Sequence, residues 1–330
     1  MVFARHLSQQ HLGQRLLSLG VATTLTTFVW GTAAWAGDPF RGNNNPSSIS
    51  DQTEAAFEAM FKDGDYPQAQ RIINAVQDES DPLVPALQAA LAYNLDGTIQ
   101  DTNNYVARTR DAAQALLDQA NASSQDQIRG NLYLAAASFM EGAYAFKQNN
   151  DYVAAALQVQ EIFRYLRNAE QIEQAAGSND PELNLVKGYI ELLLAVNLPL
   201  SNPDNAIANF ESNAQPDYLV NRGIAIAYRD LGYKNRNEQV AQAAQYFQAA
   251  SDYVERVLAV SPQNPEVQYL KAQILHEWSK LSGQENPEML AEAIELFETV
   301  LERADQLPRD LPAQIIDHEL RIAREKLAQM

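Results

Sequence analysis

One pair of residue types recurs along most of this chain: an alanine followed four positions later by a large apolar residue. Successive copies are 42 to 51 residues apart, and they are Ala69/Ile73, Ala113/Leu117, Ala155/Val159, Ala206/Phe210, Ala250/Val254 and Ala293/Phe297. Self-similarity with such a period is typical of solenoids, in which each unit is one supersecondary element stacked on its neighbours. In a helix, the alanine would let a partner helix approach closely, and the large residue would fill the gap between units.

A second pattern marks where helices should begin. Asn or Asp, then Pro, then an acidic residue occurs four times: Asp180-Pro181-Glu182, Asn202-Pro203-Asp204, Asn264-Pro265-Glu266 and Asn286-Pro287-Glu288. The first side chain can accept the free N–H groups of the first turn, proline has no N–H to leave unpaired, and the acid meets the positive helix end. Helices are therefore predicted to begin near residues 181, 203, 265 and 287, and a last one near 310.

Helical periodicity continues between these starts, and alternating strand patterns do not occur. The sequence therefore predicts an all-α protein. Residues 51–309 should form an α-solenoid of about six helix pairs, and residues 310–330 a C-terminal capping helix that hides the apolar face of the last pair.

The repeats resemble tetratricopeptide repeats. The second-helix signature of that family is matched by Ala250, Val254 and Pro262, and the first-helix signature by Ala225, Tyr228 and Leu231-Gly232. The spacing between copies is longer than the family's 34 residues, so helices or loops must be longer here. The resemblance implies helix pairs stacked into a superhelix.

The N-terminus has the plan of a secretory signal. Two basic residues, Arg5 and Arg15, precede an uncharged run over 16–35, which ends in Ala34-Trp35-Ala36. We expect residues 1–36 to be removed, which makes Gly37 the first residue of the mature chain. The alternative is an uncleaved membrane anchor, because the run is nearly long enough to span a bilayer.

Residues 37–50 are rich in Gly, Asn, Pro and Ser, and this composition predicts a flexible lead-in. The segments GDPFR and TEAAFEAMF after the signal are similar to a family of exported cyanobacterial tetratricopeptide proteins of unknown function. This resemblance implies a location in the periplasm or the thylakoid lumen.

Charge restricts the partners of the chain. The 330 residues contain 42 acidic and 24 basic residues, and two of the basic ones lie in the predicted signal. A field of this sign repels nucleic acid and anionic lipid. The chain contains no cysteine, and no segment after residue 37 is long and apolar enough to cross a membrane. We therefore expect no nucleic-acid partner and no membrane insertion of the mature chain.

Motifs for catalysis, metals or cofactors are lacking in the sequence. His276-Glu277 begins like the HExxH motif of zinc proteases, but Lys280 takes the place of the second histidine. His318 lies in the predicted last helix, where its neighbours in sequence point in other directions. We therefore expect a protein that is not an enzyme and that holds no metal and no cofactor.

The surface expected to carry function is the concave groove of the repeat stack, which the first helices line. The residues predicted to face it are Arg222, Ile226, Arg229, Tyr269, Gln273 and His276. The two arginines could hold a partner's carboxylate through paired hydrogen bonds, or they could be solvated helix residues that pair within the chain.

These patterns favour an exported, non-enzymatic scaffold that binds a protein or peptide in its groove. The first alternative is a permanent structural subunit of an envelope or thylakoid-associated complex, and it would expose a large apolar patch. The second alternative is an enzyme with an unrecognised acidic pair, which would need two close acids with raised pKa in a pocket.

Overall fold

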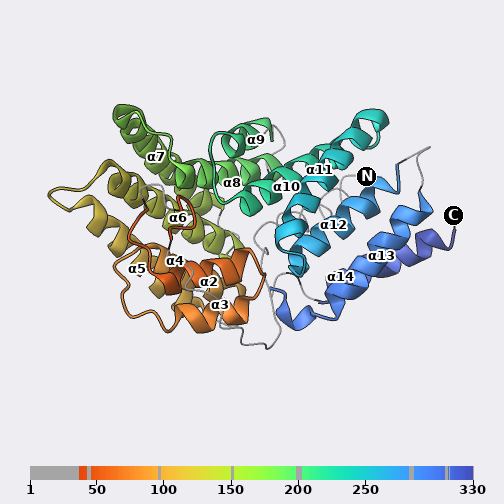
Figure 1. Ribbon diagram of the computed structural model, residues 1–330, viewed down its shortest axis with the longest axis horizontal. Helices are drawn as coiled ribbons and strands as arrows, with labels where there is room; N and C mark the ends of the chain where they lie inside the picture. The colour runs from red at the N-terminus through yellow and green to blue at the C-terminus, as the bar shows by residue number, and fades with distance from the viewer. Residues whose placement is uncertain are drawn as a thin grey trace.

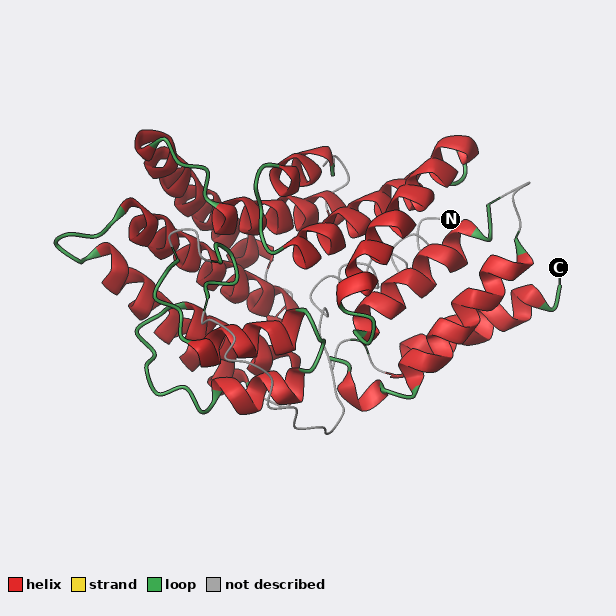
Figure 2. Cartoon of the chain, viewed as in Figure 1, coloured by secondary structure: helices red, strands yellow, loops and turns green. Residues whose placement is uncertain are grey.

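A computed structural model describes residues 37–42, 46–95, 98–149, 152–197, 203–281, 286–308, 311 and 313–329. The predicted signal, residues 1–36, lies outside the described residues. Throughout the described part the regular structure is helical, without a β-strand, so the predicted all-α class is confirmed (Figure 2).

Thirteen α-helices and one short 3₁₀ helix make up the described chain (Figure 1). In chain order they are α2 (Asp51–Phe61), α3 (Tyr66–Ile73), α4 (Leu83–Asn94), α5 (Ile99–Leu117), α6 (Ser124–Asn149), α7 (Tyr152–Ala176), α8 (Pro181–Asn197), α9 (Asp204–Glu211), α10 (Asp217–Asn235), α11 (Val240–Val260), α12 (Pro265–Trp278), α13 (Pro287–Leu301), η1 (Ala304–Gln306) and α14 (Ala313–Leu327).

The helix starts predicted from the Asn/Asp-Pro-acid pattern are confirmed. Helices α8, α12 and α13 begin at the three prolines of the pattern, and α9 begins directly after Pro203. Asn264 Oδ1 accepts hydrogen bonds from the amides of Glu266 and Val267, at 3.0 and 3.2 Å. Asp180 Oδ1 and Asn286 Oδ1 likewise accept from the amides of Leu183 and Met289, both at 3.0 Å. These three side chains satisfy amides that the first turn leaves free.

Helices that follow one another in the chain pack against each other, from α2 with α3 to α13 with α14, except that α7 and α8 make only sparse contact. In addition, the even-numbered helices from α2 to α12 contact one another in order: α2 with α4, α4 with α6, α6 with α8, α8 with α10, and α10 with α12. These six helices, which we call the inner helices, therefore form a continuous layer inside the array.

The recurring alanines lie at close helix contacts. Ala69, Ala113, Ala206, Ala250 and Ala293 are fully buried. The side chain of Ala155 lies outside the described residues, and its partner Val159 is exposed, so the packing role expected for Val159 is wrong.

Phe210 shows how a large residue fills the space between helix pairs. Its ring, on α9, lies against Gly188 of α8 and Gly223 of α10. A Cβ atom added at Gly188 would lie 2.5 Å from Cε1 of Phe210, so only glycine leaves room for the ring there. This packing buries Phe210 completely and brings α8 close to α10.

The first helix pair contacts helix α12. Asn264, at the start of α12, donates a hydrogen bond from Nδ2 to the carbonyl oxygen of Lys62 at the end of α2, at 3.0 Å. Gly64, in the α2–α3 turn, adopts a left-handed conformation (φ 71°) and lies against Asn264 and Pro265. The first helix pair therefore packs on α12, about two hundred residues further along the chain. Among the described helices, none combines the length and apolar character needed to span a membrane.

Candidate functional site

A cavity of about 390 Å³ lies inside the layer of inner helices. Its walls come from α2, α4, α6, α8 and α10, with further contributions from Phe40 and from Tyr66 of α3. The volume is within the 300–1,000 Å³ typical of small-ligand sites in proteins.

The lining of this cavity is almost wholly apolar. Leucine, phenylalanine, methionine and alanine side chains make up most of it. Ala86 and Ala90 of α4 and Ala136 and Ala143 of α6 are partly exposed to the hollow. Their spacings of four and seven residues place each pair on one helical face, so small side chains create the space.

The cavity is elongated along the inner helices. Its lining extends from Leu83 to Asn94 on α4 and from Leu132 to Ala143 on α6. On α8 it extends from Glu182 to Leu193. Each span covers eleven residue steps, which corresponds to about 16 Å of α-helix.

The two ends of the cavity differ in burial. Leu83, Leu132 and Glu182, at the beginning of these spans, are buried. Met140 and Leu193, in their last turns, are partly exposed. Among the described residues, the lining is therefore more exposed toward the C-terminal ends of α4, α6 and α8. We call this the open end and the opposite end the closed end.

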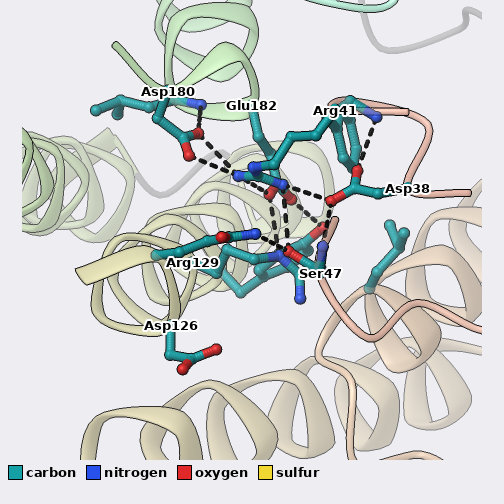
Figure 3. A network of polar contacts seen from close by, with 12 residues as sticks. Asp38, Arg41, Ser47, Asp126, Arg129, Asp180 and Glu182 are labelled. Atoms are coloured by element: carbon teal, nitrogen blue, oxygen red, sulfur yellow. Dashed lines mark hydrogen bonds and ion pairs between the residues drawn. The ribbon is translucent and has the colours of Figure 1, made fainter. Parts of the chain in front are cut away.

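The closed end is formed by a buried network of charged side chains (Figure 3). Arg129 of α6 donates to Glu182 of α8 at 3.0 Å and to Asp81, before α4, at 2.8 Å. Arg41 donates to Asp180 at 2.7 Å and to Glu182 at 3.0 Å. These bonds hold the N-terminal ends of α4, α6 and α8 together, so the three helices run parallel.

Glu182 and Tyr133 separate this network from the apolar cavity. The Tyr133 hydroxyl donates to Glu182 Oε1 at 2.8 Å. Burial, together with the neighbouring Glu182 carboxylate, raises the pKa of Tyr133 well above its ordinary value. Tyr133 therefore remains protonated and continues to act as a donor, so both residues present bonded polar atoms to the cavity.

The segment 37–42 is packed, and the expected flexibility of the lead-in 37–50 is corrected for this part. Asp38, Phe40 and Arg41 are buried, and Phe40 contributes to the cavity wall. Asp38 accepts from Arg41 at 2.8 Å and from the Ser47 amide at 2.9 Å. Burial opposes ionisation of Asp38, but the Arg41 charge and these bonds outweigh it and lower its pKa.

Two buried polar atoms at the cavity lack a hydrogen-bond partner among the described residues: Asn94 Oδ1 and Arg222 Nε. Asn94 is only 7% exposed, and its Nδ2 group donates to the carbonyl oxygen of Ala90 at 2.8 Å. Buried polar groups are almost always bonded. The Oδ1 atom is therefore an unpaired acceptor that is enclosed in the wall of the cavity.

The six residues predicted to face a partner do not line an exposed groove. Arg222, Ile226, Tyr269, Gln273 and His276 are all buried. Arg222 forms an ion pair with Glu266 of α12 in the interior. Of the six, it is the one that reaches the cavity described above.

Three of these residues belong to an internal chain of bonds. Arg229, which is partly buried, donates to Gln273 at 2.9 Å, and Gln273 donates to the Tyr269 hydroxyl at 2.9 Å. Tyr269 in turn donates to Glu319 of α14 at 3.0 Å. An open groove at these positions is therefore incorrect. The carboxylates of Glu266 and Asp230, which belong to this chain, pair with the two arginines.

Sequence reasoning missed the cavity, although one signal was present. Helix α4 has the sequence LVPALQAALAYN, which contains no charged residue on any face. A helix without a charged face is buried or lines a cavity. Tyr133 and Phe139 of α6 also line the hollow.

No protein-family model matches the sequence, and neither the curated proteins nor the solved structures include a significant match. Within the described residues, no group of three His, Cys, Asp or Glu side chains is arranged as a metal site requires. His276 is buried against Phe297, and His318 is exposed on α14.

Proposed function

We propose that this chain is an exported, non-enzymatic scaffold that binds a protein partner. In this proposal it is an α-solenoid of six helix pairs resembling tetratricopeptide repeats, with α14 as the C-terminal cap. The contacts between successive inner helices support the stacking, and the packing of α14 on α13 supports the cap. Repeat stacks of this kind commonly hold partners on their inner surface.

The observation that carries the proposal is the apolar cavity within the inner helices. The apolar hollow, which is more exposed at the ends of α4, α6 and α8, is already formed in the protein. Apolar groups of a partner can therefore be buried in it without a large rearrangement of the helices. Apolar groups of the partner would enter at the open end, where Met140 and Leu193 are partly exposed. Binding would then depend on the small size of the alanines that line the hollow.

Filling the cavity should abolish partner binding. In the double variant Ala90→Phe/Ala136→Phe, two rings would occupy the space between α4 and α6. The partner captured by the wild-type protein from an envelope fraction would be identified by mass spectrometry and purified. Its Kd for the double variant should be at least about tenfold weaker, since closing an anchor pocket commonly costs more than 1.4 kcal/mol.

The matched control is Ala107→Phe, which adds the same ring to an exposed position of α5. Circular dichroism would verify that each variant retains its helices. Equal affinity of wild type and folded double variant for the purified partner would exclude the cavity as its binding site.

Export is supported by the surroundings of Gly37. Its backbone nitrogen donates to Glu54 Oε2 at 3.0 Å. Burial, and then the neighbouring acids Glu58, Asp38 and Asp51, act to raise the pKa of Glu54. If Gly37 is the first residue of the mature chain, this nitrogen is an ammonium group and brings a positive charge to these acids.

Mass spectrometry of the protein from its native source should find an N-terminus at or near Gly37. Removal of residues 1–36 would create the ammonium group beside Glu54. Recovery of the chain with Met1 intact, from extracted membranes, would contradict the export proposal and establish a membrane-anchored form instead.

A further inference from the structure

We infer that the apolar cavity binds a single long hydrocarbon chain. The inference rests on the proposed function for the cavity being a binding site, and it adds the chemistry of the group that enters. A chain of this kind could belong to a free lipid or be attached to a partner protein.

The shape of the cavity favours a chain over a compact ligand. The hollow follows the inner helices for about 16 Å, and its volume is about 390 Å³. A compact ring system would fill only part of this length. An extended hydrocarbon chain can contact all three parallel helices from the closed to the open end.

The lining excludes a stretch of peptide backbone over the same length. Each peptide unit carries a donor and an acceptor that must be bonded when buried. Most of the wall between Leu132 and Ala143 is apolar, as is the wall between Leu185 and Leu193. At the closed end, Glu182 and Tyr133 are already bonded to each other. A hydrocarbon chain has no polar groups that need a partner. Unlike a peptide, it can therefore occupy the full length of the cavity without leaving a buried donor or acceptor unpaired.

The two ends of the cavity determine the orientation of the chain. At the closed end, the oxygen atoms of Glu182 accept bonds from Tyr133, Arg41 and Arg129, so a polar head would find no free partner on Glu182. At the other end, Met140 and Leu193 are partly exposed. The chain terminus therefore lies toward Glu182, and the head lies at the more exposed end.

The charge of the protein restricts the kind of head group. The chain has 42 acidic and 24 basic residues, which disfavours an anionic head. We therefore expect a neutral head, such as that of a long-chain alcohol or amide, rather than a fatty-acid anion.

Direct binding can be measured by displacement of the fluorescent dye N-phenyl-1-naphthylamine from the purified mature protein. We expect 1-dodecanol to bind with one molecule per chain and at least about tenfold more tightly than 1-hexanol, since affinity rises with the apolar area buried. Equal affinity for the two alcohols, or no saturable binding, would overturn the inference.

Two variants test the position of the chain. Ala90→Phe/Ala136→Phe should abolish dodecanol binding, whereas Ala107→Phe should leave it unchanged. An equal effect of the two substitutions on dodecanol binding would contradict the assigned position.

The source of the chain can be determined from protein isolated from its native compartment. Organic extraction followed by mass spectrometry would find a free lipid, whereas a lipid-modified partner would remain as a co-purified protein. Either result supports the inference. If the purified partner binds and the cavity-filling variant blocks it, but no long-chain compound binds, the proposed function stands and this inference fails.

Discussion

Replacing Arg129 with methionine should lower the free energy of unfolding by about 3–5 kcal/mol. Arg129 is almost completely buried and bonds to Asp81 and Glu182. Without it, Arg41 would be the one remaining guanidinium of a buried network that contains four carboxylates. Methionine fills a similar length of the interior but supplies no charge, so the loss comes from uncompensated buried acids. Urea denaturation monitored by circular dichroism would measure it.

Arg321→Met is the matched control for this prediction. Arg321 also pairs with an acid, Glu325 at 2.6 Å, but both side chains are more than half exposed. Exposed pairs one helical turn apart contribute about 0.3–0.5 kcal/mol. If the two variants lose similar stability, the buried network does not hold the N-terminal ends of α4, α6 and α8 together.

Replacing His276 with leucine should make the protein less sensitive to acid. Burial, and then the nearby Lys280 charge, lower the pKa of His276 from 6.5 to about 4. Its Nε2 atom has no hydrogen-bond partner among the described residues, and its ring packs edge-to-face on Phe297 at 6.0 Å. The folded protein therefore keeps this imidazole neutral at a pH where the unfolded chain has protonated it.

The sign follows from proton linkage. Between pH 6.5 and 4 the unfolded state binds a proton at His276 that the folded state does not, so stability falls as the pH falls. The shift corresponds to a loss of about 3 kcal/mol across this range. This loss of stability should be absent in His276→Leu. The stability of the variant should still change with pH to the extent that carboxylates titrate. Urea denaturation at several pH values would give the difference between the two proteins.

His318→Leu is the control, because His318 is exposed on α14 and bonds to Arg321 at 3.0 Å. It should leave the pH profile of stability close to that of the wild type. A constant stability difference between wild type and His276→Leu from pH 6.5 to 4 would show that His276 titrates alike in both states, and would contradict its burial as a neutral group.

Local signals predicted much of the architecture. The prolines at 181, 265 and 287 mark helix starts because a cap needs only the amides of the following turn. The pairing of Ala206 with Phe210 identified residues that are both buried, since close helix packing requires a small residue beside a large one. Such features depend on neighbours within one or two turns, and the order of residues alone specifies them.

The functional surface could not be predicted in this way. Arg222, Gln273 and Tyr269 lie on the inner helices as expected, but the surrounding helices bury them. The partner of Tyr269 is Glu319, fifty residues further along. Sequence patterns show which face of a helix is polar, but they do not show whether another helix of the same chain covers it.

The all-α class, the positions where helices begin and the recurrence of small and large residues at helix contacts follow from the sequence alone. Which inner surface is left uncovered depends on the tertiary structure. Arg41 meets Asp180 across 139 residues, and Asn264 meets Lys62 across 202. These contacts pack the segment 37–42 into the interior and bring the first helix pair onto α12, and an apolar cavity is left inside the layer of inner helices. Contacts of this range arise from the path of the whole chain, so no local pattern encodes them.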